Sequence, residues 1–387
     1  MIKRTKQHVP HFLLAPDSFK DSLPALEICD AMAFGIRQVI PDARITSIPL
    51  SDGGEGFTQA MILAAEGKCR PCRVSGPLGK TIQSHYGLIG YNQKTGVIEM
   101  AAASGLHLIP EARRNPLNTT TFGTGELIRK VLNHNIKQLI IGIGGSATHD
   151  LGCGLVQALG VRFYNHSGEI LRPMCGGLLH TVQSIDIHGM DSRLKDLEIM
   201  TACDVKNPVL GPHGAARTYA RQKGADDRII QDLEKGSEHI AGLIEEATGK
   251  SVRDIPGAGA AGGLGAGLTA FLDSSLKPGI DLMLDRIEFD KILRDVDYIL
   301  TGEGKTDAQT MRGKTVWGVI QRSKKQSVPV IILSGQIEPD ARNLYEHGVK
   351  TMVAIGPKSV PLKDALKNTR TDMIRTVGQI IHELVSG

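Results

Sequence analysis

The sequence is poor in aromatic residues, in long apolar runs and in segments of one charge. Aromatic residues make up 4% of the chain and the net charge is only +4, whereas a nucleic-acid surface needs a dense basic stripe with aromatic side chains. No apolar run approaches the roughly 18 residues of a membrane-spanning helix, and no secretory signal is evident. We therefore expect a soluble, cytoplasmic protein that binds neither nucleic acid nor membrane.

Cysteine is also scarce, with 6 residues in 387. Cys69 and Cys72 have the CxxC spacing of redox and zinc sites, but no second pair of ligands accompanies them. We interpret the cysteines as reduced thiols. The 45 glycines stand in separate turns without a repeat, which excludes a collagen-like or low-complexity chain.

Both ends of the chain alternate strand and helix patterns. A strand over 12–15, a helix over 26–39 and a strand over 44–50 make a β-α-β start, which is typical of a parallel sheet. Residues 69–100 instead alternate apolar and polar side chains between turns, as antiparallel strands do. We predict an α/β fold with a discontinuous Rossmann-like parallel-sheet domain and an inserted mixed α/β domain. The predicted domains are 1–68 with 285–387, and 69–284.

Three glycine-rich segments carry most of the chemical information. The segment Gly142–Asp150 follows an apolar strand and combines a small-residue turn with two hydroxyls and a carboxylate. A turn of this kind before a helix can direct backbone N–H groups at an anion. The segments 257–267 and 301–307 are similar in kind. Together they indicate a site for a phosphorylated ligand.

Two common nucleotide-binding motifs are missing or doubtful. Residues 79–81 and 313–315 have the Gly-Lys-Thr end of a P-loop but lack its earlier glycine, so a P-loop kinase is excluded. The GxGxxG spelling at 257–262 does not follow a buried strand, which weakens a dinucleotide site. A small-residue helix packed closely on a neighbour is the other interpretation of 258–267.

Polar side chains also follow the first two strands. Asp17, Ser18 and Lys20 close the first strand, and Asp52 follows the next one. Open α/β sheets bind ligands at these strand ends. Each carboxylate could instead cap a helix, but two neighbouring strand ends of this composition are a less probable coincidence.

Further candidates lie in the second half of the chain. A strand over 296–300 is expected to end at Thr301, and Glu303 and Asp307 then stand in a loop as plausible Mg²⁺ ligands or as solvated residues. Asp204 ends another strand, where it could act in catalysis or cap a helix. Lys223 lies on a helical stretch, where a lysine is usually solvated.

These motifs, in this order, resemble those of the bacterial type-1 glycerate kinases. The matching segments are Ala15–Lys20, Asp52–Gly56, Gly144–Thr148 with Asp150, Cys203–Val205 with Asn207 and Pro208, Gln222–Ala225, Gly257–Gly265, Gly302–Gly304 with Asp307 and Gln309, and Gly313 with Lys314. The resemblance implies a two-domain α/β kinase that makes 2-phosphoglycerate from D-glycerate and ATP, with its active site between the domains.

The sequence departs from the family pattern at several positions. Asp21 and Leu151 stand where glycine is usual, and His149 stands where asparagine is usual. His149 is more readily interpreted as a polar turn residue than as a catalytic base. None of these departures removes a carboxylate or lysine that we assign to the chemistry, but they leave open a shifted substrate preference.

The resemblance and the residue types together lead to hypotheses for individual roles. The candidate catalytic residues are Asp204 as base, Asp52 as second choice of base, and the lysines Lys20 and Lys314. The candidate nucleotide-binding residues are Gly144, Gly145, Ser146, Thr148, Gly262 and Gly263. The candidate substrate-binding residues are Asp17, Ser18, Lys20, Asn207 and Lys223. Glu303 and Asp307 are the candidate ligands of Mg²⁺, and ATP is the expected second substrate.

Other functions stay open at this point. A kinase of the same fold could act on another small hydroxy acid, and a non-catalytic protein could sense a phosphorylated metabolite. So many carboxylates near an anion site argue against the sensor, since binding an anion does not need them. A dehydrogenase is a weaker possibility. The chain could form a homodimer.

Overall fold

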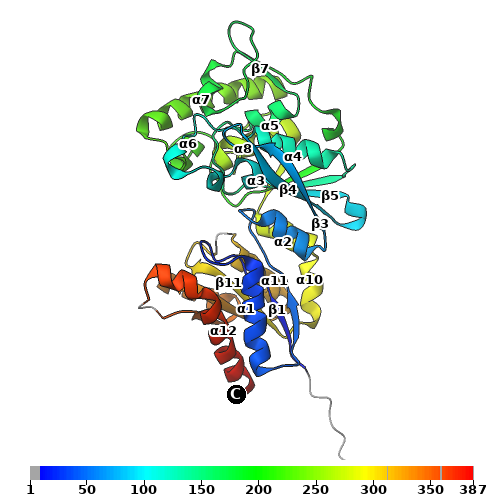
Figure 1. Cartoon of the computed structure of the whole chain (residues 1–387), viewed down its shortest axis with the longest axis vertical. Coiled ribbons are helices and arrows are strands. Elements are labelled where there is room, and N and C mark those ends of the chain that lie inside the picture. The colour runs from blue at the N-terminus through cyan, green and yellow to red at the C-terminus, as the bar shows by residue number, and fades with distance from the viewer. Residues whose placement is uncertain (1–8, 312, 358–359, 387) are drawn as a thin grey trace, which may run out of the picture. The chain divides into compact units, whose positions relative to one another are not determined.

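The structure, a computed structural model, describes residues 9–311, 313–357 and 360–386. These residues form two compact units (Figure 1). Unit 1 contains the described residues up to Asp52 and from Ile280 onward, and unit 2 is Gly53–Gly279. Helix α2 (Phe57–Ala64) therefore lies in unit 2. The domain boundaries at 68 and 285 stay a prediction.

Unit 1 is built on one sheet with the strand order β13-β12-β11-β1-β2, and every neighbouring pair is parallel. Its strands are β1 (His11–Leu14), β2 (Arg44–Ser47), β11 (Tyr298–Thr306), β12 (Val330–Ile337) and β13 (Val349–Ala354). Its helices are α1 (Ala25–Val39), α9 (Gly279–Arg286, with its first residue in unit 2), α10 (Phe289–Ile292), α11 (Thr315–Gln326) and α12 (Leu362–Ser386). The parallel sheet expected from the two chain ends is present.

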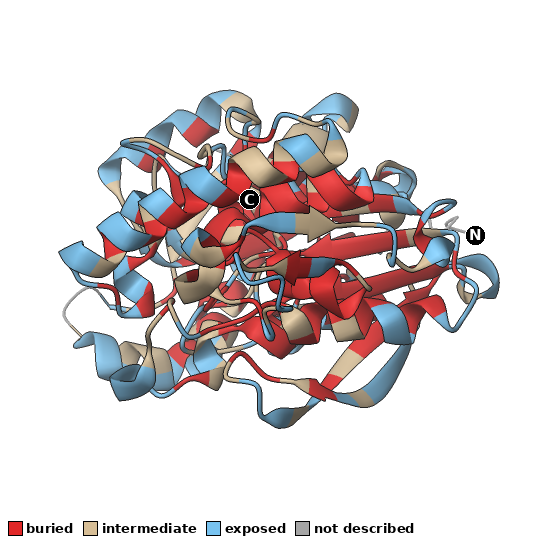
Figure 2. Cartoon of the chain, turned by 90° about the horizontal axis from the view of Figure 1, so that it is seen from above, coloured by how far each residue is buried: buried red, intermediate tan, exposed pale blue. Residues whose placement is uncertain are grey.

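Helices α1 and α12 pack against each other on one face of this sheet. The close approach depends on Gly35 of α1, where a Cβ would lie 2.7 Å from the backbone oxygen of Ile374 in α12. The apolar side chains of β1, such as Phe12 and Leu14, complete the core beneath the two helices. Figure 2 colours the whole chain by burial and shows buried residues along the strands and on parts of the helices.

Unit 2 is built on a mixed sheet with the strand order β10-β9-β6-β5-β4-β3. Its strands are β3 (Lys68–Ser75), β4 (Thr81–Ile89), β5 (Thr95–Glu99), β6 (Gln138–Gly142), β9 (Glu198–Ala202) and β10 (Ser275–Lys277), beside a small sheet of β7 (Arg162–Tyr164) and β8 (Ser184–Asp186). Besides α2, its helices are α3 (Ala101–Ser104), α4 (Phe122–Leu132), α5 (Cys153–Ala158), α6 (Ala215–Tyr219), α7 (Asp227–Thr248) and α8 (Ala260–Leu272). The strands β3, β4 and β5 pair antiparallel, as the alternating pattern predicts.

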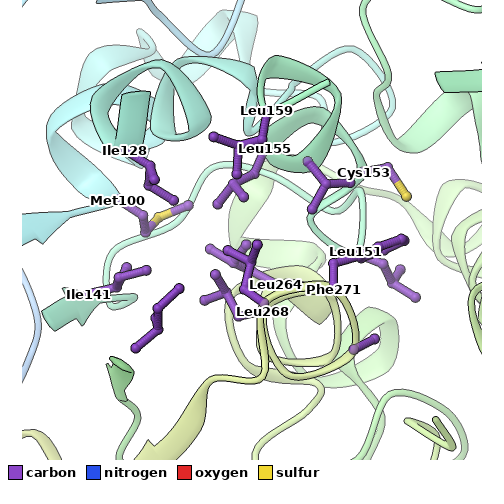
Figure 3. Close-up of a cluster of buried hydrophobic side chains, with 14 of the residues drawn as sticks. Met100, Ile128, Ile141, Leu151, Cys153, Leu155, Leu159, Leu264, Leu268 and Phe271 are labelled. Atoms are coloured by element: carbon purple, nitrogen blue, oxygen red, sulfur yellow. The ribbon is translucent and has the colours of Figure 1, made fainter. Parts of the chain in front are cut away.

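The core of unit 2 packs helix α8 against the region of α5 (Figure 3). Leu264 and Leu268 of α8 face Leu155 and Leu159, and Phe271 extends the same cluster. Gly265 and Gly267 let the backbone of α8 come close to its neighbours, since a Cβ on them would lie 2.4 Å from the oxygen of Gly257 and 2.3 Å from that of Leu151. Of the described helices, none is both long and apolar enough to span a membrane.

Strand β11 departs from the prediction in a way that matters for the site. It runs through the glycine-rich motif to Thr306, so the expected end at Thr301 is wrong. Gly302 permits this continuation, because a Cβ there would lie 2.0 Å from the backbone oxygen of Leu333 in β12. Glu303 therefore stands on a strand in the middle of the sheet and not in a loop.

Candidate active site

Unit 1 has a topological switch point between β1 and β11. The chain passes from β1 to β2 on one side and from β11 to β12 on the other, so the strand order reverses between them. Open parallel sheets bind ligands in the crevice beyond the carboxyl ends of the strands at such a point. Asp17 follows β1, and its backbone N–H donates to the oxygen of Gly302 in β11 at 2.9 Å. The structure thus brings the Asp17 and Glu303 segments together.

The Asp17 carboxylate is held by hydrogen bonds at this crevice. It accepts from the backbone N–H of Ser18 at 2.6 Å and from the hydroxyl of Thr315, the first residue of α11. Burial raises the pKa of Asp17 from its usual 3.8 to about 7, and the negative charges of Asp52 and Glu303 add to the shift. A carboxyl with a pKa near neutrality can exchange a proton at physiological pH.

Glu303 is 8% exposed, so the interpretation of this residue as part of a solvated loop is wrong. Its Oε1 accepts from the hydroxyls of Thr310 at 2.6 Å and Thr306 at 3.3 Å. Its Oε2 lies 3.9 Å from Nζ of Lys314. Burial raises the pKa of Glu303, and the hydroxyls and the lysine oppose that shift. This carboxylate is therefore fixed in position while one oxygen faces a cation.

Asp307 lies near Glu303, and its negative charge helps to raise the pKa of that residue. The Asp307 carboxylate accepts from the backbone N–H of Gln309 at 2.8 Å and lies 3.8 Å from Nζ of Lys305. Across the part of the chain that the structure describes, no three His, Cys, Asp or Glu side chains form a metal-binding group. Mg²⁺ often takes only one or two carboxylates and fills its shell with phosphate oxygens and water, so this pair fits that metal.

Lys20 and Asp52 complete the candidate residues of unit 1. Lys20 is exposed on a turn that passes Gly304, where a Cβ would lie 3.7 Å from the Lys20 backbone nitrogen. Asp52 follows β2 and is partly exposed, and its charge acts on Asp17. The predicted carboxylates and lysines of unit 1 therefore occupy one end of the sheet.

In unit 2, two glycine-rich turns pack directly on each other after β6. The backbone N–H of Gly144 donates to the oxygen of Gly53 at 3.1 Å, and a Cβ on Gly144 would lie 2.7 Å from Cα of Gly54. Gly145 is exposed and has a φ of +71°. The Gly144 amide thus holds the two turns together, while Gly145 forms the open corner of the loop.

The side chain of Lys223 contacts this loop from the interior of unit 2. It is 1% exposed, so the expectation of a solvated lysine is wrong. Its Nζ donates to Oγ of Ser146 and to the backbone oxygen of Thr148, each at 2.7 Å. Burial lowers the pKa of Lys223 from its usual 10.5 to about 7, and the charge of Asp150 opposes the shift.

The third glycine-rich segment packs on the same loop. Gly262 and Gly263 have φ values of +71° and +84°, so α8 is not regular at its beginning. A Cβ on Gly262 would lie 2.1 Å from the backbone oxygen of Thr148, and one on Gly263 would lie 2.5 Å from Cγ of Leu151. Leu151 itself has a φ of +49°, a conformation that favours the glycine usual in the resembling family. The close packing expected of this segment is present, but through left-handed turns.

Asp204 and Asn207 lie in the loop after β9. The Asp204 carboxylate accepts from the backbone N–H of Gly279, the first residue of α9, at 2.9 Å. The Asn207 amide donates to the oxygen of His213 at 2.8 Å and accepts from the hydroxyl of Tyr219 at 2.7 Å. These hydrogen bonds therefore connect the loop after β9 to the beginning of α9 and to α6.

Two other polar residues of the Gly142–Asp150 segment serve the fold. Asp150 is buried and accepts from the backbone N–H and the hydroxyl of Thr121, both at 2.8 Å. His149 is buried beside the hydroxyl of Ser237 at 2.9 Å, and burial lowers its pKa to about 3. An imidazole of this kind is a poor base at neutral pH.

The sequence does not predict the contacts that two hydroxyls of unit 1 make with the candidate carboxylates. Thr310 bonds to Glu303 and Thr315 bonds to Asp17. Threonine is common, and nothing local distinguishes these two from others. The only signal was Thr315 next to Lys314, in a Gly-Lys-Thr segment that lacks the remainder of a P-loop.

Comparison with known proteins places the chain in a family. The model of the glycerate kinase family matches residues 12–385. The chain belongs to the glycerate kinase family. Within this glycerate kinase family, a glycerate kinase of Bacillus subtilis is 46% identical over 368 residues, which cover 95% of this chain and 96% of that one. A glycerate 2-kinase of Escherichia coli is 42% identical and covers 97% of this chain and 98% of its own.

A solved structure agrees with the assignment to the glycerate kinase family. The crystal structure of a protein from Salmonella typhimurium LT2, provisionally named glycerate kinase 2, superposes with a TM-score of 0.86. The two chains are 41% identical and are covered to 98% and 99%. The family resemblance in the motifs, the mixed α/β fold and the classification as a kinase are thereby confirmed.

Proposed function

We propose that this protein transfers the γ-phosphoryl group of ATP to the C2 hydroxyl of D-glycerate. The single observation that carries the proposal is the group of carboxylates from Asp17, Asp52 and Glu303 at the switch point of a glycerate kinase family chain. Phosphoryl transfer needs a held metal, a base near the attacking hydroxyl and positive charge around the phosphates. The 42% identity to a protein named glycerate 2-kinase favours the C2 position.

The reaction forms a bond between the C2 oxygen and the γ-phosphorus and breaks the bond from that phosphorus to the oxygen that leaves with ADP. The hydroxyl proton passes to a carboxylate. We propose Asp204 as this base and Asp52 as the second choice. Asp17 is a third candidate, because its pKa of about 7 suits a group that accepts a proton at neutral pH.

Residues of unit 1 would bind the metal and offset the negative charge of the phosphates. Glu303 and Asp307 would hold Mg²⁺, which neutralises charge on the phosphates. Lys314, 3.9 Å from Glu303, and the exposed Lys20 would offset the remaining negative charge or pair with the substrate carboxylate. Ser18, bonded to Asp17, would contact the substrate.

The nucleotide phosphates would bind the loop Gly144–Thr148 in unit 2. The exposed corner at Gly145 and the adjacent hydroxyl of Ser146 support this assignment. Gly262 and Gly263 would hold the loop in place through their contacts with Thr148 and Leu151. Asn207, whose amide bonds to His213 and to Tyr219 of α6, would shape the substrate-binding side.

The test is ADP release with D-glycerate, L-glycerate, tartronate and glycolate, followed by phosphorus NMR of the product. We expect D-glycerate to be preferred and 2-phosphoglycerate to form. A 3-phosphoglycerate product would refute the C2 position. Preference for tartronate or glycolate would identify a kinase of another hydroxy acid, and no ADP with any acid would refute the kinase.

The choice of base can be tested with the same assay. Asp204→Asn, Asp52→Asn and Asp17→Asn each remove one carboxylate charge with little change of volume. The base is the residue whose loss abolishes turnover while the Kd of ATP stays close to that of the unaltered protein. Retained turnover in Asp204→Asn would make our first choice wrong.

A further inference from the structure

A buried cation lies directly beneath the exposed corner of the unit 2 loop. Lys223 is at the end of the segment Arg221–Lys223, and its ammonium group is enclosed between Ser146 Oγ and Thr148 O. These two contacts join residues that are 77 and 75 positions apart in the sequence. A buried lysine costs free energy unless its charge is used, so its position calls for a functional explanation.

The chemistry of the contact fixes the direction of a hydrogen bond. A lysine ammonium can only donate, whereas a hydroxyl has one hydrogen and two acceptor sites. Because Lys223 donates to Ser146 Oγ, the hydrogen of that hydroxyl must point to another acceptor. Ser146 is 8% exposed and follows the exposed Gly145. While Lys223 is protonated, the Ser146 hydroxyl is therefore prepared to donate to a group at the loop.

The charges around Lys223 also favour an anion at the loop. Asp150 is the acidic group that acts on Lys223, and it is already engaged by Thr121. His149, the other titratable neighbour, is held neutral by burial, which lowers its pKa to about 3. A phosphate near Ser146 would thus meet a donor hydroxyl with a positive charge behind it, and such charge-assisted bonds are the stronger ones.

We propose that Lys223 is a positioning residue for phosphate binding, which orients the Ser146 hydroxyl so that it donates to a phosphate oxygen of the nucleotide. Lys223 acts through Ser146 and does not touch the hydroxy acid. The identity of the anion as a nucleotide rests on the proposed function. The orientation of Ser146 rests on the contacts of the protonated Lys223 with Ser146 and Thr148.

The test compares Lys223→Met and Ser146→Ala with a matched control. Met keeps the length of the lysine but removes its charge and donors. Lys235 is an exposed lysine of α7, so Lys235→Met makes the same chemical change away from the loop. Calorimetry with inorganic tripolyphosphate and with ADP gives the Kd, and steady-state assays give the KM of D-glycerate.

We expect Lys223→Met and Ser146→Ala each to weaken the binding of tripolyphosphate and ADP about tenfold or more, as for the loss of a hydrogen bond to a charged group. The KM of D-glycerate should change by less than about twofold, and Lys235→Met should match the unaltered protein. The double variant should bind no more weakly than the worse single variant, because one interaction is lost in both.

Several results would overturn the proposal. Unchanged tripolyphosphate affinity in folded Lys223→Met would do so, and so would a raised KM of D-glycerate with unchanged ADP affinity. If Lys223→Met fails to fold, Ser146→Ala decides, since it leaves the lysine in place. A protein that shows no glycerate phosphorylation but binds tripolyphosphate in a Lys223-dependent way would refute the proposed function and support this inference.

Discussion

Replacing Gly262 by alanine should break the contact between two glycine-rich segments of unit 2. The added Cβ would lie 2.1 Å from the backbone oxygen of Thr148 and 2.7 Å from Cα of His149, at a φ of +71°. Holding alanine in the left-handed region costs about 1–2 kcal/mol. Displacing a packed backbone costs about 1–3 kcal/mol more. We therefore expect the free energy of unfolding to fall by about 2–5 kcal/mol.

Gly168 offers a matched control in the same unit. Its φ is +78°, but a Cβ there would meet nothing within 4 Å. Gly168→Ala should therefore show only the conformational cost of about 1–2 kcal/mol. Urea unfolding followed by circular dichroism measures both variants. Equal losses in the two would refute the packing argument. Gly262→Ala should also weaken ADP binding, since Thr148 would have to move, whereas Gly168→Ala should not.

Three further predictions follow from the charged residues. Because the pKa of Asp17 is raised to about 7, kcat/KM should rise between about pH 6 and 8 as this carboxyl loses its proton. The turnover that Asp17→Asn retains should lack this rise, and an unchanged pH profile in the variant would show that another group causes it. Glu303→Gln should raise the Mg²⁺ concentration for half-maximal activity about tenfold or more. Glu288→Gln, which breaks an exposed ion pair with Lys291, should leave that concentration unchanged, and equal effects would argue against a metal at Glu303. Lys223 loses its proton near pH 7 in the folded protein but near 10.5 when unfolded, so the unfolded state binds more protons between these values and the free energy of unfolding should rise over about pH 7–10. Lys223→Met should lack this part of the pH dependence in urea unfolding at several pH values.

Local patterns predicted much of the scaffold. The helix expected over 26–39 is α1 (Ala25–Val39), and helix α7 (Asp227–Thr248) begins directly after a local cap at Asp226. Apolar spacing along a helix and Asp226, which accepts from the backbone N–H of Ile229, act within a few residues. Such features can therefore be identified without knowledge of the remainder of the chain.

Part of the candidate site was predictable for the same reason. Asp17 follows β1, and β1 was recognisable from its apolar run. The parallel sheet then requires Asp17 to lie at the edge where ligands bind. The residue was predictable, but its pKa was not, because that depends on burial and on the charges of Asp52 and Glu303, which come from other parts of the chain.

The order of the motifs was enough to identify the family, and residue types alone pointed to carboxylates, lysines and glycine-rich turns. Contacts between distant segments decided the remainder. Strand β11 can continue past Gly302 because glycine has no side chain, and a Cβ there would collide with the backbone oxygen of Leu333 in β12. Lys223 is buried because the fold places it against acceptors on Ser146 and Thr148, which lie more than 70 residues away in the sequence. Burial and hydrogen-bond direction are properties of such pairs, and no single stretch of sequence contains both partners.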